Sequence, residues 1–166
     1  DANLEILPVT NNIDRPSAAV QKCRDEIEEV IGIPAEDCPA VSAKTGQNVQ
    51  EVLEAVVSSS PAPQGDENAP LKCLIFDSYY DSYLGVVVNV RVVDGRLHAG
   101  DRIQLMSTGA QFDVVEIGTL EPFGLQKCEC LAAGEVGYIT ASIKSVGDTR
   151  VGDTVTLASN PTPTPL

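Results

Sequence analysis

The sequence predicts two folded parts in tandem: an α/β segment over residues 1–60 and an all-β antiparallel barrel over residues 71–159. In the first part apolar residues recur at helical spacing, and in the second part the apolar period changes to two. A stretch rich in proline and polar residues, 61–70, lies between them and is expected to be a linker. Residues 160–166 alternate proline with polar residues and are expected to form an extended tail or linker.

The first part reads as strand, helix, strand, helix. The apolar run over residues 4–9 predicts a buried strand, and Ser17 and Gly32 are expected to cap and stop the helix that follows. Residues 38–42 predict a second strand, and Asn48 is expected to cap the second helix, with Glu51 completing a capping box. This order is typical of parallel strands covered by helices. Two strands and two helices make a poor independent domain, so we expect the end of a larger α/β sheet.

The second part contains about six short strands rich in valine. Four valines, at positions 86, 88, 90 and 92, share one face of the longest strand, and Asn89 and Arg91 are expected on the other face. Asp94-Gly95 is typical of a hairpin turn. Because closure removes exposed strand edges, we expect a small closed barrel. The predicted strands cover residues 71–76, 84–93, 101–106, 111–120, 135–143 and 154–157.

Composition excludes several classes of protein. With 24 acidic and 11 basic residues the net charge is −13, so binding of nucleic acid through an overall basic field is excluded and any such contact must use a local patch. No apolar run is long enough to cross a membrane, and the N-terminus does not resemble a signal peptide. Five cysteines without framework spacing indicate thiols in a reducing compartment, not a secreted disulfide scaffold or a zinc site. The chain lacks an initiator methionine, so we expect a piece of a longer or processed protein.

Two loops of the first part follow the carboxyl ends of its predicted strands, where open α/β sheets bind their ligands. They are Asn11-Asn12-Ile13-Asp14 and Ser42-Ala43-Lys44-Thr45-Gly46. A carboxylate can accept two N–H groups from the Watson–Crick edge of guanine, and backbone N–H groups of the second loop can donate to the guanine carbonyl. Taken singly, each loop is more simply an ordinary turn or connection. Together, on corresponding strand ends, they predict a base-binding pocket.

The two loops resemble the guanine-specificity motifs of P-loop GTPases, Asn-Lys-x-Asp and Ser-Ala-Lys. The second motif matches in full, whereas Asn12 stands where the family has lysine. Residues 74–86, 90–95, 105–109 and 133–138 are similar to the domain II region of the elongation factor 4 family of translational GTPases. The resemblance implies the end of a P-loop GTPase G domain followed by a translation-factor domain II. It also implies guanine-nucleotide contacts by Asn11, Asp14, Ser42, Ala43 and Lys44.

The family implies a ribosome-binding GTPase that uses GTP/GDP and Mg²⁺ and acts on tRNA position or fidelity in elongation. This sequence contains no Gly-x-x-x-x-Gly-Lys-Ser/Thr phosphate loop, so we expect the intact protein to hydrolyse GTP and this chain alone to be inactive, with no catalytic residue and no metal ligand of its own. The expected partners are the small-subunit rRNA of the ribosome and tRNA. We expect a monomer without a transmembrane segment, and peripheral membrane association stays open.

Two alternatives remain. The chain could be a non-catalytic ribosome- or protein-binding module with a decayed nucleotide site, which Asn12 favours, or another translational GTPase such as elongation factor G or initiation factor 2. The compartment is equally open among a bacterial cytoplasm, a chloroplast stroma and a mitochondrial matrix. The cluster of Tyr79, Tyr80 and Tyr83 with Asp77 and Asp81 is either a contact surface or a mixture of core and rim residues.

Overall fold

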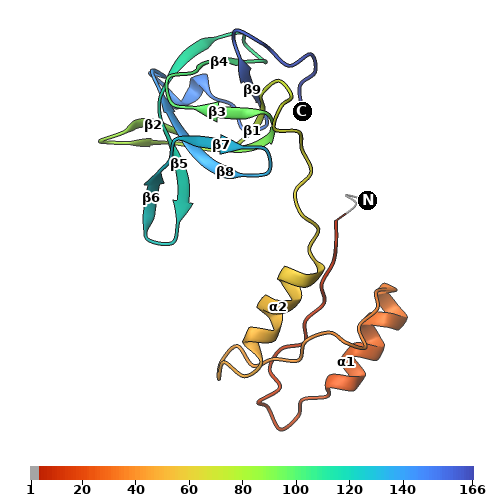
Figure 1. Cartoon of the computed structure of the whole chain (residues 1–166). Coiled ribbons are helices and arrows are strands. Elements are labelled where there is room, and N and C mark those ends of the chain that lie inside the picture. The colour runs from red at the N-terminus through yellow and green to blue at the C-terminus, as the bar shows by residue number, and fades with distance from the viewer. Residues whose placement is uncertain (1–3) are drawn as a thin grey trace. The chain divides into compact units, whose positions relative to one another are not determined.

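The computed structural model describes residues 4–166 and divides the chain into two compact units, Asp1–Pro61 and Ala62–Leu166 (Figure 1). The first unit contains α1 (Val20–Glu26), which continues as the π-helix η1 (Ile27–Ile31), and α2 (Val49–Ser59). The second unit is built from strands, with one short 3₁₀-helix, η2 (Val146–Asp148).

Within residues 4–61, the strand pairing of the first unit is reduced to two isolated bridges, a parallel one between Thr10 and Ala40 and an antiparallel one between Ser42 and Gln47. The parallel direction agrees with the prediction, but residues 4–9 do not form a strand. Leu4 and Ile6 are 76% and 60% exposed, and within the described residues this segment pairs with no strand before Thr10. A backbone that meets only one partner gains too few hydrogen bonds to hold a regular ladder.

The first helix ends as predicted but begins differently, and the second begins at the predicted residue without the predicted cap. Gly32 stops η1 in the left-handed conformation at φ 77°, a conformation that glycine adopts without strain. The first helix begins at Val20 without a side-chain cap, so the expected cap at Ser17 is wrong, because a turn that joins Ala18 N–H to the Arg15 carbonyl occupies this segment. Asn48 holds the N-cap position of α2, but its amide donates to the Ala40 carbonyl at 2.9 Å instead of capping the helix.

The second unit is a closed antiparallel barrel of six strands, β4-β9-β1-β2-β8-β5, in which β4 pairs with β5 to complete the ring. All six strands were predicted from the sequence. Three further short strands were not: β6 extends β5 as a hairpin, and β3 and β7 form a separate two-stranded sheet. The strands are β1 (Lys72–Asp81), β2 (Gly85–Asp94), β3 (Arg96–His98), β4 (Arg102–Leu105), β5 (Gln111–Glu121), β6 (Gly124–Lys127), β7 (Cys130–Ala132), β8 (Val136–Ala141) and β9 (Thr154–Leu157).

The barrel interior is filled by the predicted valine face of β2 and by aliphatic residues of the other strands. Asn89 was expected on the solvent side, yet it is buried, and its side-chain oxygen has no hydrogen-bond partner among the described residues. Asp94-Gly95 does turn the chain, with Gly95 at φ 79°, but the following strand β3 pairs with β7 and not with β2. The hairpin prediction at this turn is therefore wrong.

The segments that precede and follow the barrel are bound to it. Asp66 accepts a hydrogen bond from Gly95 N–H at 2.8 Å, and Glu67 forms an ion pair with Arg96. In the tail, Thr162 is buried and its N–H donates to the Thr156 hydroxyl at 2.8 Å. The extended stretches expected from proline content are thus partly ordered against the barrel surface.

Candidate functional site

The Thr10–Ala40 bridge brings the two predicted loops together. Thr10 N–H donates to the Pro39 carbonyl at 2.9 Å, and Val41 N–H donates back to the Thr10 carbonyl at 2.8 Å. One step further, Ile13 N–H donates to the Val41 carbonyl at 3.2 Å. These backbone bonds place residues 11–14 and 42–44 at the same end of the paired segments.

Asn11 joins the loops directly. Its side-chain oxygen accepts the N–H of Asn12 at 2.7 Å and the N–H of Ala43 at 3.1 Å. The first bond shapes the loop that carries Asp14, and the second fixes the backbone of the Ser-Ala-Lys segment. Asn11 is therefore a positioning residue for both halves of the site.

Asp14 and Ser42 form the second link between the loops. The Ser42 hydroxyl donates to Asp14 Oδ1 at 2.7 Å and accepts the N–H of Thr45 at 3.2 Å. Ser42 is fully buried, whereas Asp14 is exposed. A buried hydroxyl thus orients a carboxylate that solvent, or a ligand, can reach.

Lys44 and Asn12 are the remaining positions of the two motifs, and they differ in backbone setting and in their agreement with the family motif. Lys44 is exposed at the turn that Gly46 closes in a left-handed conformation, at φ 79°. Asn12 also has a left-handed backbone, at φ 68°, which asparagine tolerates better than most residues with a Cβ. The lysine that the GTPase family has at this position would take a less favourable backbone conformation here.

The donors and acceptors of the site fit a guanine base with one change from the expected arrangement. Asp14 can accept from the N–H groups of the Watson–Crick edge. The Ala43 N–H, expected to donate to the guanine carbonyl, already donates to Asn11. Among the described residues no hydrogen bond uses the Lys44 N–H, so this group is the available backbone donor of the loop.

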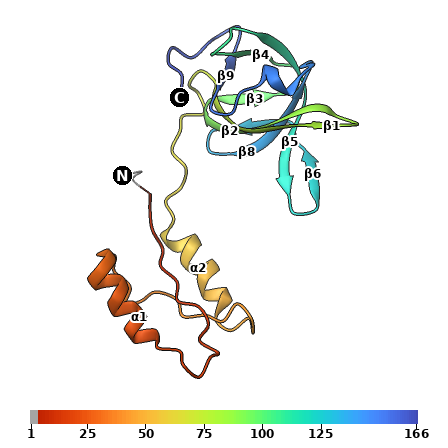
Figure 2. The same cartoon turned by 180° about the vertical axis from the view of Figure 1, so that it is seen from behind.

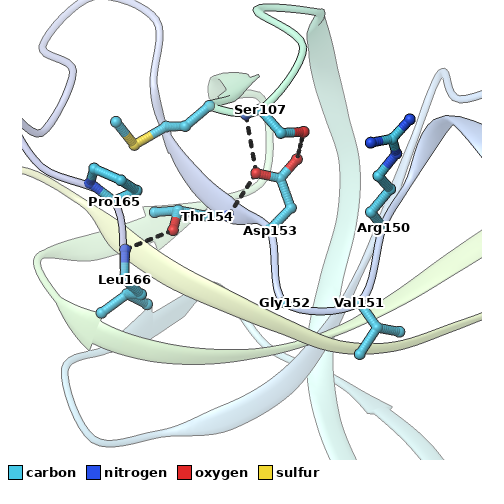
Figure 3. Close-up of a pocket in the computed structure, with 9 residues that line it drawn as sticks. Ser107, Arg150, Val151, Gly152, Asp153, Thr154, Pro165 and Leu166 are labelled. Carbon is cyan, nitrogen blue, oxygen red and sulfur yellow. Dashed lines mark hydrogen bonds between the residues drawn. The ribbon is translucent and has the colours of Figure 1, made fainter.

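Other features of the described residues offer no competing catalytic centre. No group of three His, Cys, Asp or Glu residues within 4–166 is placed to hold a metal ion. A cavity of about 530 Å³ lies against the barrel beside β9 (Figure 3). Its carboxylate, Asp153, is already bonded to Ser107 N–H at 3.0 Å and to Thr154 N–H at 2.7 Å, and it also accepts the Ser107 hydroxyl. The Asp153 carboxylate therefore has a structural role: it connects the loop at Ser107 to the start of β9.

Sequence reasoning missed one polar network on the barrel surface. The Tyr138 hydroxyl donates to Glu116 at 2.7 Å, and Glu116 also forms an ion pair with Lys127 of β6. Lys127 and then the Tyr138 hydroxyl hold the pKa of Glu116 below its ordinary value, and burial raises the pKa of Tyr138. No spacing signal joins positions 116, 127 and 138, because β5, β6 and β8 bring them together only in the folded sheet.

The sequence profile of the family described as Elongation factor Tu domain 2 matches residues 85–156, which cover β2 to β9 of the barrel. Proteins named Elongation factor 4 match nearly the whole chain. The protein from Clostridium perfringens strain SM101 is 60% identical over 162 residues, 98% of this chain and 27% of the relative. Those from Lactobacillus gasseri and Acetivibrio thermocellus are both 57% identical over 166 residues, all of this chain and 27% and 28% of the relatives.

The chain therefore spans little more than a quarter of the length of these relatives, which are bacterial. Their alignment covers both units, and the domain profile independently assigns the barrel as a translation-factor domain II. Over the region that it spans, the chain is thus similar along nearly its whole length to proteins named Elongation factor 4, and its barrel matches the Elongation factor Tu domain 2 family.

Proposed function

We propose that this chain supplies the guanine-side wall of the nucleotide site, together with domain II, of a ribosome-binding translational GTPase. The observation that carries the proposal is the pair of bonds between the loops, Asn11 to Ala43 and Asp14 to Ser42. They hold an exposed carboxylate and an available backbone donor at one end of two parallel segments, which is where an open α/β sheet binds its ligand.

In the proposed reaction the intact protein hydrolyses GTP, and this chain contributes recognition of the base. The phosphate loop, the Mg²⁺ ligands and the switch segments that phosphoryl transfer requires would come from outside residues 1–166. Because those parts stabilise the transferred phosphoryl group, we expect no hydrolysis by this chain alone. Asp14 would read the guanine edge, Ser42 would orient Asp14, and Asn11 would hold the two loops in register.

The proposed partners are the ribosome, through the small-subunit rRNA, and tRNA, with an effect on tRNA position or fidelity during elongation. The similarity of the chain to proteins named Elongation factor 4 and the domain profile match of its barrel support this. No helix among residues 4–166 is long and apolar enough to cross a membrane. Since the relatives named above are bacterial, we propose a bacterial cytoplasm as the compartment and a monomer as the working form.

The test replaces the matching region of the Clostridium perfringens relative with this chain, so that only these residues vary. Fluorescent GDP and ADP are titrated into the chimera and into its Asp14→Asn variant. The chimera should select GDP. The variant should lose about tenfold or more in GDP affinity, because the amide replaces one carboxylate oxygen with an NH₂ donor that faces a guanine N–H group and cannot accept from it. The Asp14→Asn variant should gain affinity for xanthosine diphosphate, whose base presents a carbonyl where guanine presents an amino group.

The second candidate is a non-catalytic binding module with a decayed nucleotide site, which the asparagine at position 12 favours. The same titration separates the two functions. A chimera that binds neither GDP nor ADP, while the unmodified relative binds GDP, supports the module and contradicts the guanine site. Equal binding of both nucleotides contradicts the assignment of Asp14.

A further inference from the structure

The aromatic residues of this chain are concentrated outside its core. Of the four tyrosines and three phenylalanines, four lie in the short segment Phe76–Tyr83, which forms the outer half of β1 and the turn into β2. All four are more than a third exposed, and Tyr80 and Tyr83 reach 67% and 93%. Large aromatic side chains gathered on one exposed element are typical of an interaction surface.

The β1–β2 hairpin projects beyond the barrel wall, as Figures 1 and 2 show from opposite sides. Tyr79 pairs with Val87 and Tyr80 with Val86, so the two adjacent tyrosines lie on opposite faces of the hairpin. The projecting hairpin thus offers aromatic surface on both faces.

The charge of the segment is negative throughout. Residues 73–90 contain no lysine or arginine, and Asp77 is exposed within β1. Asp81 accepts the N–H groups of Tyr83 and Leu84, both at 2.8 Å, and these bonds hold the pKa of Asp81 below its ordinary value. The hairpin therefore presents ionised carboxylates beside tyrosine rings.

We propose that the segment Phe76–Tyr83 is a docking surface for an arginine-rich segment of a partner protein. A planar guanidinium stacks on aromatic faces and pairs with carboxylates, and the hairpin supplies both groups side by side. Lysine fits less well because its ammonium is compact and strongly hydrated.

Nucleic acid is the less suitable occupant. Stacking of bases on aromatic residues works in combination with a positively charged groove that follows the phosphates. Residues 73–90 contribute no cation, and Lys127 of β6 is held in an ion pair with Glu116. Phosphates approaching the hairpin would meet the carboxylates of Asp77 and Asp81. This surface is built from residues of the second unit and the nucleotide site from residues of the first, so its test is independent of the proposed GTPase function.

The experiment titrates a short peptide of alternating arginine and glycine into the isotope-labelled 166-residue chain at physiological ionic strength, which screens the net charge of −13. The NMR shifts should be confined to residues 76–87. The double variant Tyr80→Ser, Tyr83→Ser should bind about tenfold more weakly, because two exposed cation–π contacts are lost. The same peptide with lysine in place of arginine should bind the unaltered chain about threefold more weakly.

Matched controls separate this surface from general attraction to an acidic protein. Phe123→Ser removes an equally exposed aromatic from the β5–β6 hairpin, and Glu129→Gln removes an exposed carboxylate elsewhere. Both should bind as the unaltered chain does, whereas Asp77→Asn should weaken binding about threefold. Equal effects of Asp77→Asn and Glu129→Gln, equal affinity for the two peptides, or shifts of the same tyrosines by a single-stranded RNA oligonucleotide would each overturn the proposal.

Discussion

The side-chain oxygen of Asn11 accepts a hydrogen bond at 3.1 Å from the N–H of Ala43, a residue 32 positions later in the chain. This bond and the Asp14–Ser42 bond connect two loops that are also joined by the Thr10–Ala40 bridge and the backbone bonds beside it. The geometry of the candidate site therefore depends on one amide and one hydroxyl.

Replacing Asn11 with alanine should release the second loop. The Ala43 N–H loses its acceptor, and a hydrogen bond of this kind contributes about 1 kcal/mol, so its hydrogen exchange should accelerate about fivefold. Exchange measured by NMR on the 166-residue chain checks this. Asn11→Asp keeps an acceptor oxygen and should retain the protection. Unchanged exchange in the alanine variant would show that the bond does not hold the loop.

Replacing Asn12 with lysine tests the departure from the GTPase motif. Lysine adds a cation near the nucleotide, which should tighten GDP binding by the chimera about fivefold. At φ 68° it also costs about 1 kcal/mol of folding stability, because a lysine Cβ is crowded in this conformation. GDP titration and thermal unfolding measure the two effects. Asn12→Gly keeps the backbone without the charge, and equal GDP affinity of the two variants would contradict the role of the cation.

The six barrel strands could be predicted from the sequence because each has its own period-two pattern and is bounded by turns. The strands β3, β6 and β7 are only three or four residues long, so they carry too little pattern to be recognised. The prediction of a strand at residues 4–9 is wrong for another reason. A parallel strand depends on neighbours distant in sequence, and the described residues supply only Ala40.

The residues of the candidate site were predicted from motif resemblance, but their bonding was not. The Ala43 N–H donates to the Asn11 side chain, and the Asn48 side-chain amide donates to the Ala40 carbonyl. Both bonds depend on loop conformations with positive φ, at Asn12 and at Asn48. Such conformations leave only a weak preference for asparagine or glycine in the sequence. The burial of Asn89 could not be predicted from the sequence either, because it follows from the packing around β2 and not from the polarity of the side chain.

The Glu116–Lys127 pair should make barrel stability depend on pH. The ion pair lowers the pKa of Glu116 from 4.5, so its contribution is complete above that value and is lost as the pH falls through the folded pKa. Glu116→Gln should therefore unfold about 4 °C lower at neutral pH and approach the unaltered chain under acidic conditions. Calorimetry at several pH values measures the difference. Glu129→Gln is the control, and a difference that stays constant with pH would exclude the pair as its source.

Replacing Asn89 with valine should stabilise the barrel. Its Oδ1 is buried without a hydrogen-bond partner within residues 4–166, and valine suits a β-strand better, so a gain of about 1 kcal/mol is expected in urea unfolding. Asn89→Asp provides the opposite change, because a buried carboxylate without a partner costs more than an amide. A valine variant less stable than the unaltered chain would indicate that the amide is bonded to water.

Gly118 fixes the position of the Tyr138 ring. A Cβ on Gly118 would lie 2.2 Å from the Gln126 carbonyl oxygen and 2.5 Å from Tyr138 Cε1, so alanine must displace β6, the ring or both. Gly118→Ala should therefore lower the free energy of unfolding by about 2 kcal/mol, since overpacking of a close contact carries that order of cost. Gly147→Ala is the matched control: its new Cβ would meet only Ser145 Oγ, at 3.4 Å, and the change should stay within about 0.5 kcal/mol. Displacement of the ring should also break the Tyr138–Glu116 bond, which the chemical shifts of the Tyr138 ring would report. Equal stabilities of the two variants would mean that β6 and the Tyr138 ring yield to the added methyl group without strain, which would contradict the close packing inferred at Gly118.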